Sequence, residues 1–101
     1  MPTISLTPDQ IDLIHGTIVA TDLDGVIRGL MGRAKPTTRG TVNLRGTDQE
    51  FDELLSALAR ECRAYLSLDE ERAGHELDAP LPGSTAHRLS IIADKMEQLL
   101  S

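Results

Sequence analysis

Length, composition and charge exclude several classes of protein before any motif is considered. The chain has 101 residues, of which 40% are hydrophobic and 26% are charged, as in an ordinary globular domain. We expect one small domain over residues 1–101 with little room for an internal cofactor. The net charge of −6 argues against binding of nucleic acid or anionic membranes by the surface as a whole.

The first element predicted is a strand that leads directly into a helix. Ile4 and Leu6 alternate with polar residues, as in a strand with one buried face, and we place this strand at residues 3–7. The Thr-Pro-Asp-Gln sequence that follows puts proline at the first helical position and Gln10 where it closes a capping box. This pattern predicts a helix over residues 8–20.

The next region carries two apolar faces that do not coincide. The first face comprises Ile11, Ile14 and Ile18, and the second comprises Val19, Leu23, Val26 and Leu30. A single straight helix would spread these residues over half of its circumference. We therefore expect a break near Thr21 and a second helix over residues 22–33, with Asp22 as its cap. A strand over residues 17–21 is the alternative.

A second strand and helix start repeat the first pattern. Val42 and Leu44 alternate with polar residues and predict a strand over residues 41–45. A threonine three residues before Glu50 forms another capping box and predicts a helix over residues 48–66. The apolar stripe of this helix consists of Phe51, Leu54, Leu55, Leu58, Cys62 and Tyr65.

The last helix is expected over residues 85–100, where Leu89, Ile92, Met96 and Leu99 form its apolar stripe. Ser84 or Thr85 would cap it. Residues 67–84 are acidic and contain two prolines, so we expect a solvated connector between the last two helices.

Together these elements predict a mostly helical α+β domain, with two short strands and three or four helices. Short strands at the edge of a sheet leave backbone groups unpaired, and pairing across a twofold axis would satisfy them. We therefore expect a homodimer.

One segment resembles a catalytic motif. Residues 18–26 read Ile-Val-Ala-Thr-Asp-Leu-Asp-Gly-Val and resemble the first motif of the haloacid dehalogenase-like phosphohydrolases, in which an apolar strand delivers an Asp-x-Asp-Gly turn. The resemblance implies magnesium-dependent phosphoryl transfer, with Asp22 as nucleophile and Asp24 as general acid and base. It covers nine of the 101 residues, and that family needs a sheet of several parallel strands. A helix break with an N-cap is the simpler interpretation.

Half of the positive charge lies within residues 28–45. Arg33, Lys35 and Arg39 occupy a polar, turn-prone part of this segment, where cationic side chains and free backbone amides favour anions. Binding of a phosphate or a nucleic acid is therefore one candidate function. Nucleic acid is not favoured, because no aromatic residue is interleaved for base stacking. Such a loop more commonly pairs with the protein's own acidic helix.

The leading hypothesis follows from the negative charge of another segment, residues 46–83. Residues 46–83 carry ten acidic and three basic residues, which suggests a small, non-catalytic interaction or regulatory module that engages a basic surface of a protein partner. The candidate partner-binding residues are Glu50, Glu53, Glu61, Asp69, Glu70 and Glu71. We expect no enzyme activity and no catalytic residue.

Other potentially reactive side chains do not form a recognisable site. No two of the three histidines have the i, i+4 spacing that places both on one helical face, so we expect neither a metal site nor a cofactor. Cys62 belongs to an apolar stripe and is expected to pack in the core. A single cysteine, no secretory signal and no run of about 18 apolar residues predict a cytoplasmic protein outside the membrane.

Overall fold

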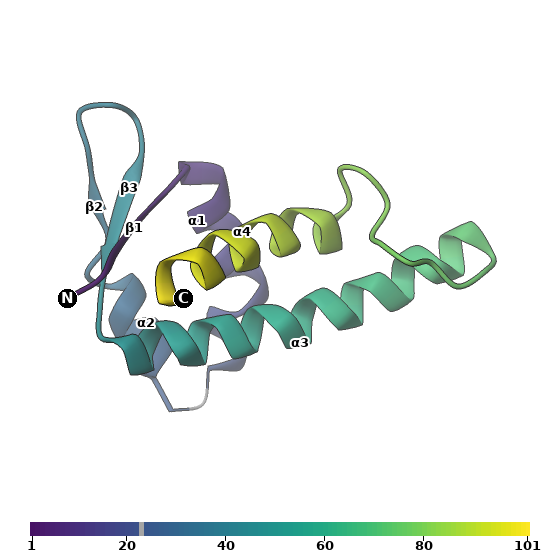
Figure 1. Ribbon diagram of the computed structural model, residues 1–101, viewed down its shortest axis with the longest axis horizontal. Coiled ribbons are helices and arrows are strands. Elements are labelled where there is room, and N and C mark those ends of the chain that lie inside the picture. The colour runs from purple at the N-terminus through teal and green to yellow at the C-terminus, as the bar shows by residue number, and fades with distance from the viewer. Residues whose placement is uncertain (23) are drawn as a thin grey trace.

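The computed structural model describes residues 1–22 and 24–101 and shows a mostly helical α+β fold (Figure 1). The expected fold class is confirmed. Within the described residues the elements are, in order, β1 (Thr3–Leu6), α1 (Pro8–Thr17), the 3-10 turn η1 (Val19–Thr21), α2 (Val26–Met31), β2 (Lys35–Pro36), β3 (Val42–Arg45), α3 (Asp48–Ala73) and α4 (Thr85–Leu100).

Both predicted capping boxes are present. The Thr7 hydroxyl accepts from the backbone N–H of Gln10 at 3.1 Å, and the Gln10 side chain accepts from the backbone N–H of Thr7 at 2.9 Å. Thr47 and Glu50 repeat these two bonds at the start of α3, with the same distances. Since each box satisfies two backbone donors that a helix leaves free, α1 and α3 begin where the sequence predicts.

The three strands form one antiparallel sheet in the order β1-β3-β2. The pairing of the two predicted strands places Thr3 opposite Arg45. β2 was not predicted, because its two residues carry no apolar alternation. The carbonyl of Ser5 accepts a hydrogen bond from Nζ of Lys95 in α4, which covers part of β1. Dimer formation through strand edges stays a prediction.

The break after α1 is real, but the second helix begins later than predicted. α1 ends at Thr17, η1 replaces the alternative strand over residues 17–21, and α2 begins at Val26 after Gly25, whose φ is 76°. Asp22 nevertheless accepts a 2.8 Å hydrogen bond from the backbone N–H of Arg28 in the first turn of α2. The carboxylate therefore stabilises the helix start from outside the N-cap position. Leu23, which the sequence analysis places on the second apolar face, lies outside the described residues.

The predicted end of the long helix at residue 66 is wrong. α3 continues to Ala73 and ends at Gly74, whose φ of 77° is the left-handed conformation that favours glycine. Asp69 is only 3% exposed, so the segment that was expected to be a solvated connector begins as a helix with one buried face. The loop proper lies between α3 and α4, and of the two predicted caps, Ser84 and Thr85, it is Ser84 that caps α4.

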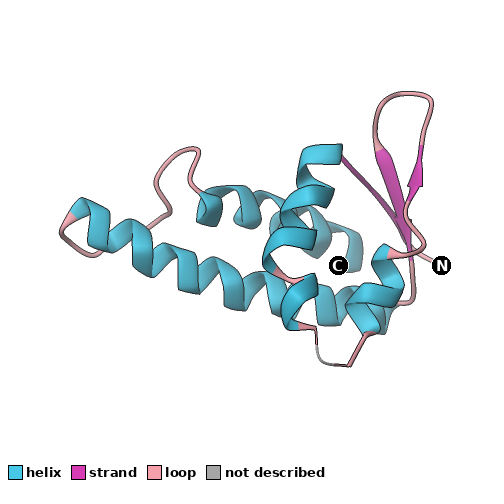
Figure 2. Cartoon of the chain, turned by 180° about the vertical axis from the view of Figure 1, so that it is seen from behind, coloured by secondary structure: helices cyan, strands magenta, loops and turns pink. Residues whose placement is uncertain are grey.

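α4 packs along α3. The sheet lies near the N-terminal end of α3, far from the C-terminal end of that helix (Figures 1 and 2). The largest fully buried side chains are Leu6, Ile14, Ile18, Leu30, Leu44, Phe51, Leu54, Leu58, Leu89, Ile92 and Met96. The buried residues of β1 and β3 turn one face of the sheet toward this core and leave the alternate residues outside. No helix among residues 1–22 and 24–101 has the length and apolar character needed to cross a bilayer.

Candidate functional site

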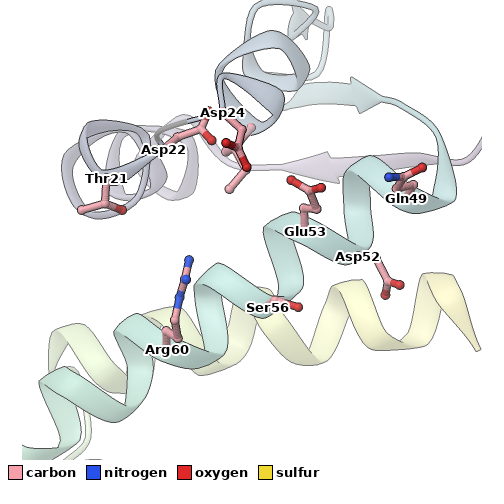
Figure 3. A pocket seen from close by; sticks show the side chains of 9 residues that line it. Thr21, Asp22, Asp24, Gln49, Asp52, Glu53, Ser56 and Arg60 are labelled. Carbon is pink, nitrogen blue, oxygen red and sulfur yellow. The ribbon is translucent and has the colours of Figure 1, made fainter.

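A groove of about 460 Å³ separates the start of α2 from the first half of α3 (Figure 3). We call it the acidic groove. One wall consists of Thr21, Asp22, Asp24 and Ile27, and the other consists of Gln49, Asp52, Glu53, Ser56 and Arg60. Figure 3 shows Glu53 and Arg60 extending from α3 toward the segment that carries Asp22 and Asp24.

Four carboxylates and one guanidinium line this groove. Within the described part of the chain none of these five groups forms an ion pair. Like charges that share a groove destabilise one another, and a cationic ligand relieves that repulsion. The described residues contain no group of three or more acidic, histidine or cysteine side chains placed to hold one metal ion.

The predicted acidic partner-binding residues do not form one surface. Glu53 lines the acidic groove, whereas Glu61 is half-buried and Glu71 is exposed, both outside the groove. Asp69 accepts hydrogen bonds from the backbone N–H of Leu81 at 3.1 Å and from the Ser84 hydroxyl at 2.7 Å. Through these contacts Asp69 holds the loop between α3 and α4. The expectation that Asp69 is exposed to a partner is therefore wrong.

Two further candidates also have partners within the chain. Glu70 accepts a 3.0 Å hydrogen bond from the backbone N–H of Leu77. Glu50 forms an ion pair with Arg33 and a hydrogen bond with the backbone N–H of Thr47. Arg33 chiefly, and then Thr47, lower the pKa of the Glu50 carboxyl below its ordinary value. The suggestion that the basic loop pairs with the protein's own acidic helix is therefore confirmed at this position.

The predicted basic residues are divided between two places. Arg33 and Lys35 line a cavity of about 370 Å³ beside the sheet, together with Met1, Thr3, Asn43 and Arg45. We call this cavity the basic cleft. Arg39 lies in the turn between β2 and β3 and does not line it. Sequence reasoning missed Asn43 and Arg45, although the alternation of β3 already indicated that both point away from the core.

The acidic groove was missed for a different reason. The sequence patterns indicate catalysis or capping for Asp22 and catalysis for Asp24, and they indicate no role for Asp52. The structure puts η1 before Asp22 instead of a strand, and the sheet formed by the described residues is antiparallel. The resemblance to the haloacid dehalogenase-like enzymes therefore has no support from the arrangement around this turn.

Cys62 packs at the edge of the core, as expected. Its thiol is half-buried and donates to the carbonyl of Ala86 at 3.4 Å. Burial raises the pKa of this thiol, and the negative charges of Asp94 and Asp69 add to the effect. A protonated, partly covered thiol is a weak nucleophile, so these surroundings favour a packing role.

Comparison of the chain with protein-family models, with curated proteins and with solved structures finds no match. We therefore infer function from geometry and charge.

Proposed function

We propose that this protein is an interaction module that binds a basic segment of a protein partner in the acidic groove. The observation that carries the proposal is that Asp22, Asp24, Asp52 and Glu53 all line one groove of about 460 Å³, without an ion pair to any described residue. Lysine and arginine side chains have the charge and the length to reach several of these carboxylates.

The walls of the groove also suggest how a partner is oriented. Asp22 is held in place by its hydrogen bond to the backbone of Arg28, so one acidic wall is ordered before a partner arrives. Arg60 is the only cation among the described residues that line the groove. We expect lysine or arginine of the partner to lie near Glu53 and Asp24, and a carboxylate or a backbone carbonyl to lie near Arg60.

The charged groups of the groove are largely exposed to solvent, which determines the kind of binding. Such groups contribute more to the association rate and to specificity than to affinity, and salt screens them over about 8 Å at physiological ionic strength. We therefore expect weak, salt-sensitive association. The single cysteine is compatible with a cytoplasmic setting for this interaction.

The test is binding of a fluorescent peptide rich in lysine and arginine, followed by anisotropy as the salt concentration rises. The variant Asp52→Asn with Glu53→Gln removes two charges from the groove and should weaken binding by roughly five- to tenfold at low salt. The matched control, Glu71→Gln with Glu76→Gln, removes two exposed charges outside the groove and should have less than about a twofold effect. Equal weakening by both pairs would mean that net charge alone attracts the peptide, and would contradict the proposal.

A further inference from the structure

The basic cleft is assembled by the register of the sheet. Thr3 lies opposite Arg45, and Lys35 lies opposite Asn43. Directly opposed residues of antiparallel strands project to the same face, with about 4.5–5.5 Å between their Cβ atoms. Since Ile4 and Leu44 are buried on the other face, these four side chains project away from the core. Residues from all three strands of the sheet therefore line the cleft.

Two of the three cations in this cleft are free to bind a ligand. Within residues 1–22 and 24–101, neither Lys35 nor Arg45 forms an ion pair or a side-chain hydrogen bond. Arg33 is shared with Glu50, and its Nε donates to the carbonyl of Gly29 at 3.3 Å. Its remaining N–H groups can still donate, because a guanidinium has five.

The polar lining completes a set of donors. The Asn43 carbonyl oxygen accepts from the Ser5 hydroxyl, which leaves the amide nitrogen of Asn43 as a donor toward the cleft. The Thr3 hydroxyl lies in the same lining, and among the described residues no carboxylate lines this cleft. Two guanidiniums, one ammonium, one amide and one hydroxyl match an anion with several oxygens and more than one charge.

We propose that the basic cleft binds the phosphate group of a small phosphorylated molecule. A phosphate offers three exposed oxygens to these donors, and arginine can bind two of them at once. A nucleic-acid strand fits less well, because none of the described residues that line the cleft has an aromatic side chain for base stacking. The net charge of −6 also opposes a long polyanion much more than a small one. The proposal is independent of the acidic groove.

The test uses inorganic phosphate and pyrophosphate as probes, with ¹H–¹⁵N NMR titration at low salt to locate binding and calorimetry to measure affinity. We expect saturable shifts of the amides of Thr3, Lys35, Asn43 and Arg45. Lys35→Gln and Arg45→Gln should each weaken pyrophosphate binding by about tenfold, the usual effect of losing one charge-assisted hydrogen bond. Arg39→Gln is the matched control, because it removes the same charge outside the cleft, and its effect should be less than about twofold.

Three results would overturn the proposal. They are the absence of saturable shifts with either anion, an equal loss of affinity in Arg39→Gln, and tighter binding of a single-stranded oligonucleotide than of pyrophosphate. The groove variant Asp52→Asn with Glu53→Gln should keep pyrophosphate affinity within about twofold, which separates failure of this site from failure of the proposed function. Circular dichroism of each variant should show the wild-type spectrum, as expected if these substitutions leave the fold intact.

Discussion

Replacing Asp69 with alanine would test whether the loop between α3 and α4 is held by a buried carboxylate. Asp69 is 3% exposed, and one of its oxygens accepts from both the Leu81 backbone N–H and the Ser84 hydroxyl. The Ser84 oxygen in turn accepts from the backbone N–H of His87, which caps α4. The carboxylate therefore supports the loop and the start of the last helix together.

The expected magnitude follows from these contacts. A hydrogen bond to a charged group contributes about 1.5–3 kcal/mol, and alanine would remove both of them. Leu81 and Ser84 are half-buried, so water can replace part of what is lost. We expect the free energy of unfolding of Asp69→Ala to fall by about 2–3 kcal/mol. For a domain of this size that corresponds to a Tm lower by roughly 8–20 °C.

Urea unfolding followed by circular dichroism measures this loss. Asp78→Ala is the control, because Asp78 is an exposed acid in the same loop and should change the free energy of unfolding by less than about 0.5 kcal/mol. Combining Asp69→Ala with Ser84→Ala should cost less than the sum of the two single changes, since the residues share a hydrogen bond. An Asp69→Ala variant as stable as Asp78→Ala would refute the reasoning.

Two further predictions concern the junction between β3 and α3. A Cβ at Gly46 would lie 2.6 Å from Cδ1 of the buried Leu30, so Gly46→Ala should lower the free energy of unfolding by about 1–3 kcal/mol in urea. At Gly29 an added Cβ would meet no described atom within 4 Å apart from its chain neighbours and the backbone of its own helix, so Gly29→Ala should be neutral or stabilising. Equal losses in both variants would contradict the packing argument. Arg33 lowers the pKa of Glu50 in the folded state. The ion pair between them therefore stabilises the fold at neutral pH, and this stabilisation is lost as the pH falls through the lowered pKa of Glu50. The Tm difference between the wild type and Glu50→Gln should therefore shrink as the pH falls from about 6 to about 3, and a constant difference would count against the ion pair.

Local signals in the sequence were sufficient for most of the fold. Thr7 with Gln10, and Thr47 with Glu50, are neighbours along the chain, so their capping bonds could be predicted without knowing the tertiary structure. The apolar stripe of α3 likewise predicted which face is buried. The end of α3 was missed because a buried acidic residue does not belong to an apolar pattern, and β2 was missed because two residues show no period.

The sequence by itself determined the two longer strands, the starts of α1, α3 and α4, the faces that these elements bury and the excess of negative charge. Only the tertiary structure decided which charged groups remain free. Arg33 and Glu50 meet across 17 residues, and Asp69 and Ser84 meet across 15, so Glu50 and Asp69 are paired within the chain and leave the predicted partner-binding surface. The acidic groove and the basic cleft are likewise built from segments that are separated along the chain. The physical reason is that electrostatic interactions depend on distance through space, which the order of residues along the chain does not specify.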